Sequence, residues 1–139
     1  MGGDLARFVA AQQPVYDQAL AELRRGQKES HWMWFVFPQV AGLGQSATSI
    51  HYAIGSLEEA RAYLHHPLLG ARLAECTDAV LAHAGTPAER IFGSVDAAKF
   101  RSSMTLFEAA AGGGGGRFAE ALGVFFNGER DAATLRLLR

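Results

Sequence analysis

Apolar residues recur at helical spacing along nearly the whole chain, and residues that start or stop helices bound most of these stretches. The stretch after Pro67 repeats large apolar residues at intervals of four and three, which is the spacing of one helix face. Ser56 and Glu59 form a capping box before another helix, and Asp131 is placed to cap the last one. No segment combines polar and apolar alternation with β-branched enrichment, so no strand is predicted. We therefore predict an all-α fold, a compact single domain of about seven or eight short helices over residues 1–139.

The composition excludes several classes of protein. A chain of 139 residues suits one domain, and 49 % hydrophobic with 19 % charged residues excludes a disordered chain. Thirteen Lys and Arg against fourteen Asp and Glu give a net charge of -1, which argues against binding nucleic acid through bulk charge. The single cysteine, Cys76, cannot form an internal disulfide, so nothing in the sequence demands an oxidising compartment.

One long segment lacks charge, and it has to be distinguished from a membrane span. No Asp, Glu, Lys or Arg occurs between Glu29 and Glu58. The uninterrupted apolar run inside it extends only from Trp32 to Phe37, whereas a spanning helix needs roughly 20 apolar residues. The N-terminus carries acids and bases and does not resemble a signal peptide. We predict no membrane association and a cytoplasmic location.

Five consecutive glycines, Gly112 to Gly116, superficially resemble a phosphate-binding loop. Such a loop needs a preceding strand and a Lys-Ser or Lys-Thr pair after its glycines. Here the residues Ala109–Ala111 precede the glycines and Arg117 follows them, so neither condition holds. A flexible linker between two helices is the better interpretation.

The densest aromatic cluster is Lys28–Gln39, which contains both tryptophans of the chain. A buried hydrophobic hub is the simplest interpretation, because Trp, Phe and Met are the usual materials of a small core. The functional alternative is a pocket lined by Trp32 or Trp34, with Lys28 and His31 as polar groups beside it. An indole offers a flat stacking surface, and an ammonium group offers a charge for phosphate.

A second group of polar residues lies in the region after Gly93. If this region is one helix, Asp96, Lys99 and Ser103 share a face, because residues three and four apart are neighbours on a helix. Asp96 and Lys99 are either a solvated ion pair worth a few tenths of a kcal/mol or part of an anion site near the helix N-terminus. Both interpretations remain open from the sequence.

The aromatic segment Trp32–Phe37 and the segment Ser102–Phe107 are expected to lie close together. Both carry more large apolar residues than a solvent-facing helix can use, and burying each Trp or Phe stabilises the fold by roughly 1.5–3 kcal/mol. Contact is expected between a tryptophan and Phe100, Met104 or Phe107. Lys28 and His31 on one side, with Asp96, Lys99 and Ser103 on the other, would then border a common cleft.

Several motifs together resemble domain-of-unknown-function family 1810, a bacterial family whose members are often mislabelled as calpastatin. The motifs are Lys28–Gln39, Gly42–Ser46, Tyr52–Ile54, Glu59–Ala60, Tyr63–Leu64, His66–Pro67, Asp96, Lys99 and Ser102–Phe107. The resemblance covers nearly the whole chain and implies a compact, mainly helical domain with no established activity. The calpastatin label does not suit this chain, because inhibitors of that kind are charged and disordered whereas this chain is half apolar.

Two functions from different classes follow from these observations. The first is a pocket for a small anionic, nucleotide-like ligand, formed by Lys28, His31, Trp32, Trp34, Asp96, Lys99 and Ser103. No cofactor is predicted, and no His or Cys cluster has the spacing of a zinc site. Asp96 could act as a base, but the sequence identifies no second catalytic group, so the question of enzymatic activity stays open. The second is a protein-interaction module or homodimer with an exposed aromatic patch, suggested by nine Phe and two Trp in a short chain.

Overall fold

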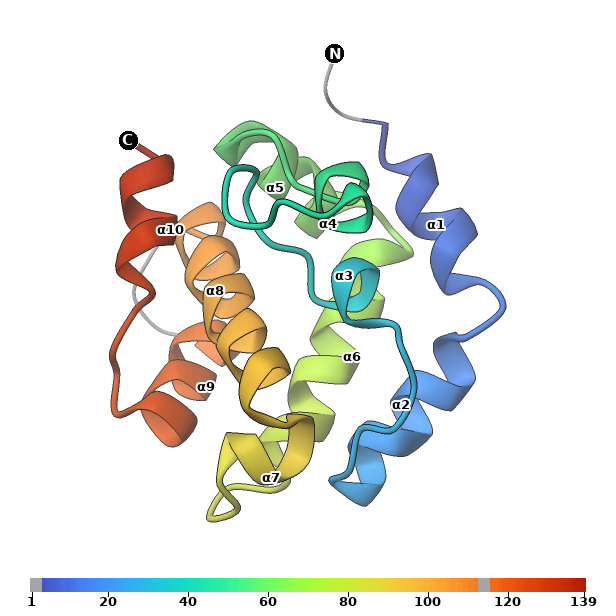
Figure 1. The fold of residues 1–139 in the computed structure, drawn as a ribbon, viewed down its shortest axis with the longest axis vertical. Coiled ribbons are helices and arrows are strands. Elements are labelled where there is room, and N and C mark those ends of the chain that lie inside the picture. The colour runs from blue at the N-terminus through green and yellow to red at the C-terminus, as the bar shows by residue number, and fades with distance from the viewer. Residues whose placement is uncertain (1–3, 113–115) are drawn as a thin grey trace.

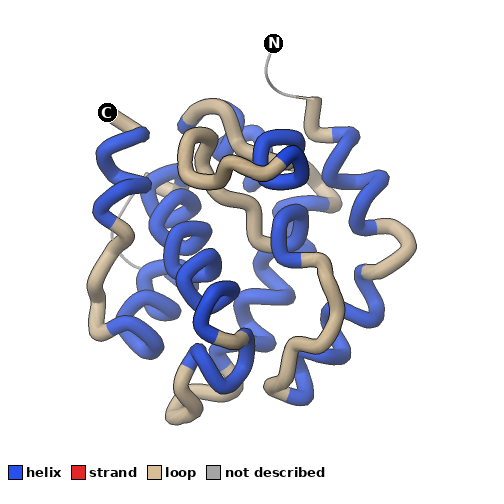
Figure 2. Tube along the Cα trace, in the orientation of Figure 1, coloured by secondary structure: helices blue, strands red, loops and turns tan. Residues whose placement is uncertain are grey.

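Ten helices make up the part of the chain that the computed structural model describes, residues 4–112 and 116–139. They are α1 (Ala6–Gln12), α2 (Tyr16–Arg25), α3 (Met33–Val36), α4 (Ala47–His51), α5 (Leu57–His65), α6 (Leu69–Leu81), α7 (Ala88–Phe92), α8 (Ser94–Ala110), α9 (Gly116–Phe126) and α10 (Ala132–Leu137). Within these residues no strand forms, and one parallel bridge joins Val40 to Ile54 (Figure 2). No helix in the described ranges has the length and apolarity needed to cross a bilayer.

The two longest helices, α6 and α8, form the middle of the domain (Figure 1). Helix α8 packs against α5, α7 and α9, while α6 packs against α2, α5 and α9. The short helix α3 contacts α1 and α6. The segments on either side of α3 therefore cross the domain close to its centre, and any polar group that they carry is brought near these long helices.

The all-α, single-domain prediction is confirmed, but the predicted number of helices is wrong. The prediction of about seven or eight omits α3 and α4, which contain four and five residues. Helices this short have no apolar repeat for a periodicity argument to detect. Helix α4 begins where the Ser46 hydroxyl accepts a hydrogen bond from Ser49 N at 3.1 Å, and α3 is held by burial of Met33 and Val36. Of the glycine run predicted as a linker, Gly112 follows α8, Gly116 begins α9, and residues 113–115 lie outside the described ranges.

The predicted caps at Ser56 and Asp131 form. Ser56 Oγ accepts from Glu59 N at 3.0 Å, and Asp131 Oδ2 accepts from Thr134 N at 3.0 Å. The reciprocal bond of the capping box is shifted by one residue, because the Glu59 carboxylate accepts from Gly55 N at 2.6 Å. That shift leaves the second oxygen of Glu59 free to meet another helix.

The aromatic segment contacts α8 through the ring of Phe37, where a tryptophan was expected, and its partner Phe100 precedes the expected segment Ser102–Phe107. Phe37 meets Phe100 with 5.0 Å between ring centroids, in an edge-to-face arrangement that favours aromatic pairs. The Trp32 ring lies next to Phe37, with 6.3 Å between the two ring centroids. The contact thus brings the N-terminal half of the chain against the first half of α8, which carries Asp96 and Lys99.

Candidate functional site

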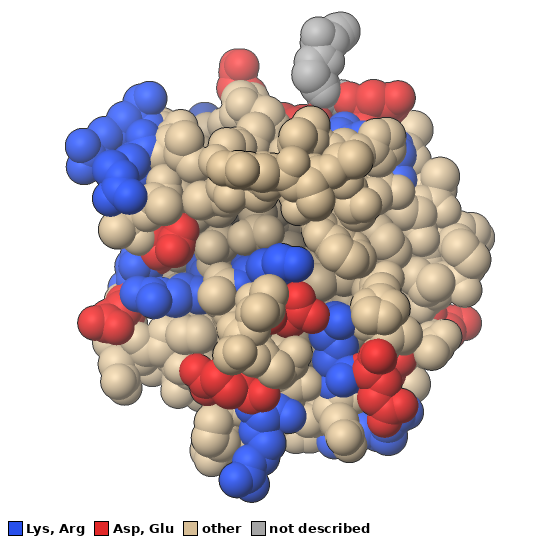
Figure 3. All heavy atoms as spheres, in the orientation of Figure 1, with Lys and Arg blue, Asp and Glu red and all other residues tan. Residues whose placement is uncertain are grey.

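Both lysines of the sequence meet at one carboxylate, that of Asp96 in the first turn of α8. Lys28 Nζ lies 2.9 Å from Asp96 Oδ2, and Lys99 Nζ lies 3.6 Å from Asp96 Oδ1. Two ammonium groups against one carboxylate leave the cluster with a net positive charge. In Figure 3, basic and acidic side chains adjoin near the centre of the face shown, over α8 and the segment before α3.

Each lysine also lies over the ring of a tryptophan. Lys28 Nζ is 5.0 Å from the ring centroid of Trp32, and Lys99 Nζ is 4.9 Å from that of Trp34. Such cation–π contacts are worth about 0.5–1 kcal/mol at exposed sites and about 2 kcal/mol when desolvated. The two lysines and the two tryptophans of the chain therefore form one cluster around Asp96, which we call the Lys–Trp cluster.

The two halves of the Lys–Trp cluster differ in accessibility. The Lys28 side chain is 7 % exposed and Trp32 is 1 % exposed, and Lys28 Nζ also donates to Ser30 O at 2.6 Å. The Lys99 side chain is 24 % exposed, and Trp34 is half-buried. Lys28 and Trp32 thus form the buried half of the cluster, whereas Lys99 and Trp34 form the half that reaches the surface.

The buried half of the cluster is held in place by the buried carboxylate of Glu22 on α2. Glu22 Oε1 accepts from Glu29 N at 2.9 Å, from Ser30 N at 3.0 Å and from Trp32 Nε1 at 2.9 Å. Its other oxygen accepts from the Ser30 hydroxyl. Burial alone raises the pKa of Glu22, but the hydrogen bonds from Ser30, Glu29 and Trp32 outweigh it and lower that pKa from 4.5 to about 2.

A shallow hollow, with about 250 Å³ of space when the open solvent at its mouth is counted, adjoins the accessible half of the cluster. Trp34 forms part of its wall, so Lys99 lies over a ring that also faces the hollow. The remaining lining residues are Gln39, Val40, Gly44, Ser49, Tyr52 and Ala53. The hollow therefore combines aromatic surface with amide and hydroxyl side chains, and Lys99, which is not a lining residue, contacts the Trp34 ring of its wall.

The structure brings five of the seven predicted site residues together: Lys28, Trp32, Trp34, Asp96 and Lys99. His31 is exposed, and among the described residues no hydrogen bond or ion pair joins it to this cluster. Ser103 is fully buried, and its hydroxyl has no hydrogen-bond partner among the described residues. The predicted ion pair of Asp96 and Lys99 is present, but the shorter partner of Asp96 is Lys28, which is 68 positions away in the sequence.

The described residues contain no group of three His, Cys, Asp or Glu side chains arranged to hold a metal ion. Cys76 is fully buried, and burial raises the pKa of its thiol to about 12. At neutral pH this thiol is protonated and is not a nucleophile.

Sequence reasoning missed the residues that build the hollow and support it. Gln39, Ser49 and Tyr52 line the hollow, and Glu22 supports the cluster. The uncharged stretch between Glu29 and Glu58 was the available signal, because a segment without charges that is too polar to span a membrane must be held by groups outside itself.

Comparisons with known proteins agree with this fold and add no activity. Residues 2–138 match the model of a family described as a protein of unknown function, DUF1810. A crystal structure of a conserved hypothetical protein from Mycobacterium tuberculosis is 51 % identical, with a TM-score of 0.93, over 97 % of this chain and 96 % of that chain. No curated protein gives a significant match.

Proposed function

We propose, from the premise that this chain belongs to the DUF1810 family of proteins of unknown function, that the hollow beside Trp34 binds a small anionic ligand carrying a planar ring. The observation that carries this proposal is the position of Lys99. Its ammonium group lies over the ring of Trp34, and Trp34 is part of the wall of the hollow. A ligand stacked on Trp34 would thus lie near a cation, although Lys99 itself does not line the hollow.

Lys99 is the lysine that is able to turn toward a ligand. Its distance of 3.6 Å to Asp96 exceeds that of an ordinary hydrogen bond, so moving it breaks no short contact. Asp96 would keep its ion pair with Lys28 at 2.9 Å, because Lys28 stays in the buried half of the cluster. An anion that recruits Lys99 thus gains a charged partner without leaving the Asp96 carboxylate unpaired.

The remaining wall favours a ring with polar edges. Tyr52 and Trp34 supply aromatic surface, while Gln39 and Ser49 supply donors and acceptors for hydrogen bonds. The hollow is shallow, because its enclosed space of about 10 Å³ corresponds to one water molecule, and the rest of it is open to solvent. A nucleotide-like ligand would therefore lay one ring or one phosphate against this wall and leave the rest in solvent.

Replacing Lys99 with glutamine is expected to weaken binding of such a ligand by about tenfold to a hundredfold. The reason is that a hydrogen bond to a charged group contributes about 1.5–3 kcal/mol. Thermal shift with AMP, ADP-ribose, NAD, sugar phosphates and inorganic phosphate would identify binders, because a ligand at 100 times its Kd stabilises a protein by roughly 2.7 kcal/mol.

The matched control is Arg90→Gln, which removes the same charge from an exposed residue on α7. This variant should bind the same compound as tightly as the unaltered protein. The proposal is refuted if none of these compounds raises the melting temperature, or if Lys99→Gln and Arg90→Gln weaken binding equally.

The protein-interaction alternative has less support. The large apolar side chains that are exposed in the described ranges are aliphatic: Ile50, Val95, Val124, Leu135 and Leu137. They belong to α4, α8, α9 and α10, and the aromatic rings that suggested a contact patch are buried or half-buried. A homodimer stays a prediction, and light scattering during size-exclusion chromatography tests it.

A further inference from the structure

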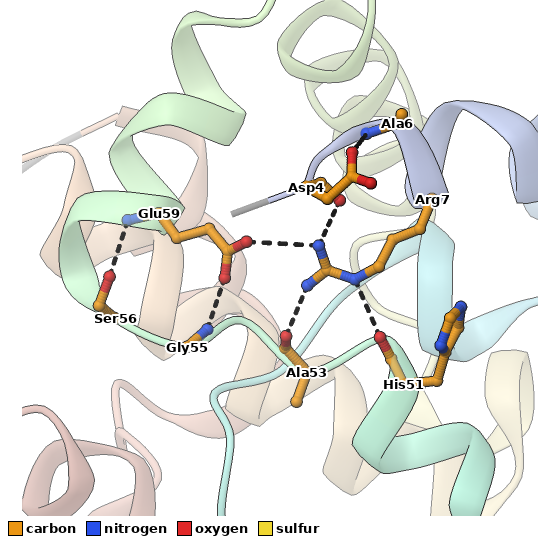
Figure 4. A network of polar contacts seen from close by, with 8 residues as sticks. All are labelled: Asp4, Ala6, Arg7, His51, Ala53, Gly55, Ser56 and Glu59. Carbon is orange, nitrogen blue, oxygen red and sulfur yellow. Dashed lines mark hydrogen bonds and ion pairs between the residues drawn. The ribbon is translucent and has the colours of Figure 1, made fainter. Parts of the chain in front are cut away.

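Arg7 on α1 reaches across to the chain between α4 and α5 and uses all three nitrogens of its guanidinium group (Figure 4). Its Nε donates to the His51 carbonyl at 2.9 Å, and its Nη2 donates to the Ala53 carbonyl at 2.8 Å. Its Nη1 donates to the Asp4 carbonyl and lies 3.4 Å from Glu59 Oε2. The guanidinium thus joins the start of α1, the end of α4 and the first turn of α5.

The two carbonyls that Arg7 holds flank Tyr52, and both Tyr52 and Ala53 line the hollow. The Tyr52 ring packs against Phe8 at 5.9 Å and Phe35 at 5.3 Å between centroids. Contacts on the ring and hydrogen bonds on the backbone therefore fix this part of the wall from two directions.

The segment that carries the wall, residues 30–57, has no permanently charged side chain. Residues 30–57 contain no Asp, Glu, Lys or Arg, so an anchor based on charge has to come from outside. Glu59 provides it, since its largely buried carboxylate accepts from Gly55 N at 2.6 Å and faces Arg7 with its other oxygen. The position of Arg7 is in this way tied to the beginning of α5.

We infer that Arg7 is a positioning residue that sets the shape of the hollow by holding the backbone on both sides of Tyr52. The effect of Arg7 on ligand binding rests on the proposed function, whereas its effect on the shape of the hollow rests on the contacts of Arg7 alone. Arginine is needed because its planar guanidinium presents two adjacent N–H groups at fixed angles to two carbonyls. A lysine at this position retains the charge beside Glu59 but offers a single nitrogen.

The test is Arg7→Lys, followed in the ligand-free protein by the ¹H–¹⁵N NMR signals of residues 41–54 and of the Trp34 indole. We expect these signals to shift, with the Trp32 indole signal unchanged. The matched control is Arg117→Lys, which alters another arginine–carboxylate contact, with 2.9 and 3.1 Å between Arg117 and Asp78, away from the hollow. It should leave the signals of residues 41–54 in place.

A second variant separates the carbonyl contacts from the ion pair. Glu59→Gln keeps an acceptor for Gly55 N and removes the charge facing Arg7, so the same signals should shift by less than in Arg7→Lys. For binding, titration with AMP should give at least a threefold higher Kd for Arg7→Lys and an unchanged Kd for Arg117→Lys.

Unchanged signals over residues 41–54 in Arg7→Lys would overturn the inference, as would equal shifts in Arg7→Lys and Arg117→Lys. If the unaltered protein fails to bind AMP, the AMP form of the proposed function fails separately, and the ligand-free signals still decide the role of Arg7. Shifted signals with an unchanged AMP Kd would overturn the link between Arg7 and binding.

Discussion

Replacing Gly70 with alanine is expected to lower the free energy of unfolding by about 3 kcal/mol or more. A Cβ atom at Gly70 in α6 would lie 2.1 Å from the Leu64 carbonyl oxygen and 2.9 Å from its carbonyl carbon. These are backbone atoms of α5, so the clash is relieved only by separating the two helices. Urea unfolding followed by circular dichroism measures the loss.

The matched control is Gly123→Ala in α9, where a Cβ atom would meet no other atom within 4 Å. There the substitution should stabilise the protein by about 0.5–1 kcal/mol, because alanine favours a helix over glycine. The opposite signs of the two substitutions test the close packing of α5 against α6. Equal effects at Gly70 and Gly123 would contradict that packing.

The second large effect is expected for Glu22→Gln, which should destabilise the protein by about 3 kcal/mol at pH 7. The carboxylate accepts from two backbone N–H groups, the Trp32 indole and the Ser30 hydroxyl. A glutamine has one oxygen in place of two, and its amide group would face buried donors. Glu120→Gln, at an exposed position of α9, is the control and should be nearly neutral.

The same carboxylate makes stability depend on pH in the acidic range. The pKa of Glu22 is lowered to about 2 in the folded protein from 4.5, so its contribution is fully present above pH 4.5 and is lost as the pH falls toward 2. A depression of this size corresponds to roughly 3 kcal/mol. Acid titration of unfolding should show this loss in the unaltered protein. An identical acid profile in Glu22→Gln would contradict the assignment.

The helices that begin at a capping residue could be predicted from the sequence because their signals are local. Ser56 and Asp131 accept the hydrogen bonds expected of caps, and those bonds depend on residues three positions away. Helices α3 and α4 could not be predicted, because four or five residues give no apolar repeat. Helix α3 is held by its contacts with α1 and α6, whereas α4 has no buried residue and begins at the Ser46 cap.

The candidate site was predicted in part for the same reason. Asp96 and Lys99 share a helix face, so their ion pair follows from spacing alone. Trp32 and Trp34 are two residues apart and lie at the start of a short helix, which turns them to different surroundings. Which of the two indoles reaches the surface depends on Glu22, and a glutamate in α2 looks like a solvated side chain until its partners are seen.

Arg7 shows more clearly which contacts cannot be predicted from the sequence. Its acceptors are backbone carbonyls more than forty positions away, and a carbonyl has no signature in the sequence. The uncharged stretch indicated that some outside group must hold it, but not which group. Tertiary placement of α1 beside the chain between α4 and α5 decides that.

The most direct test of the proposed site is the response of the two tryptophan indole signals to AMP in a ¹H–¹⁵N NMR titration. The signal that is lost in Trp34→Phe identifies Trp34, and the other belongs to Trp32. We expect the Trp34 signal to shift with saturation, because this ring lines the hollow beneath Lys99. The Trp32 signal should stay in place, because that indole is buried and donates a hydrogen bond to Glu22. A Trp34 signal that stays unmoved while AMP shifts signals elsewhere would contradict binding in this hollow.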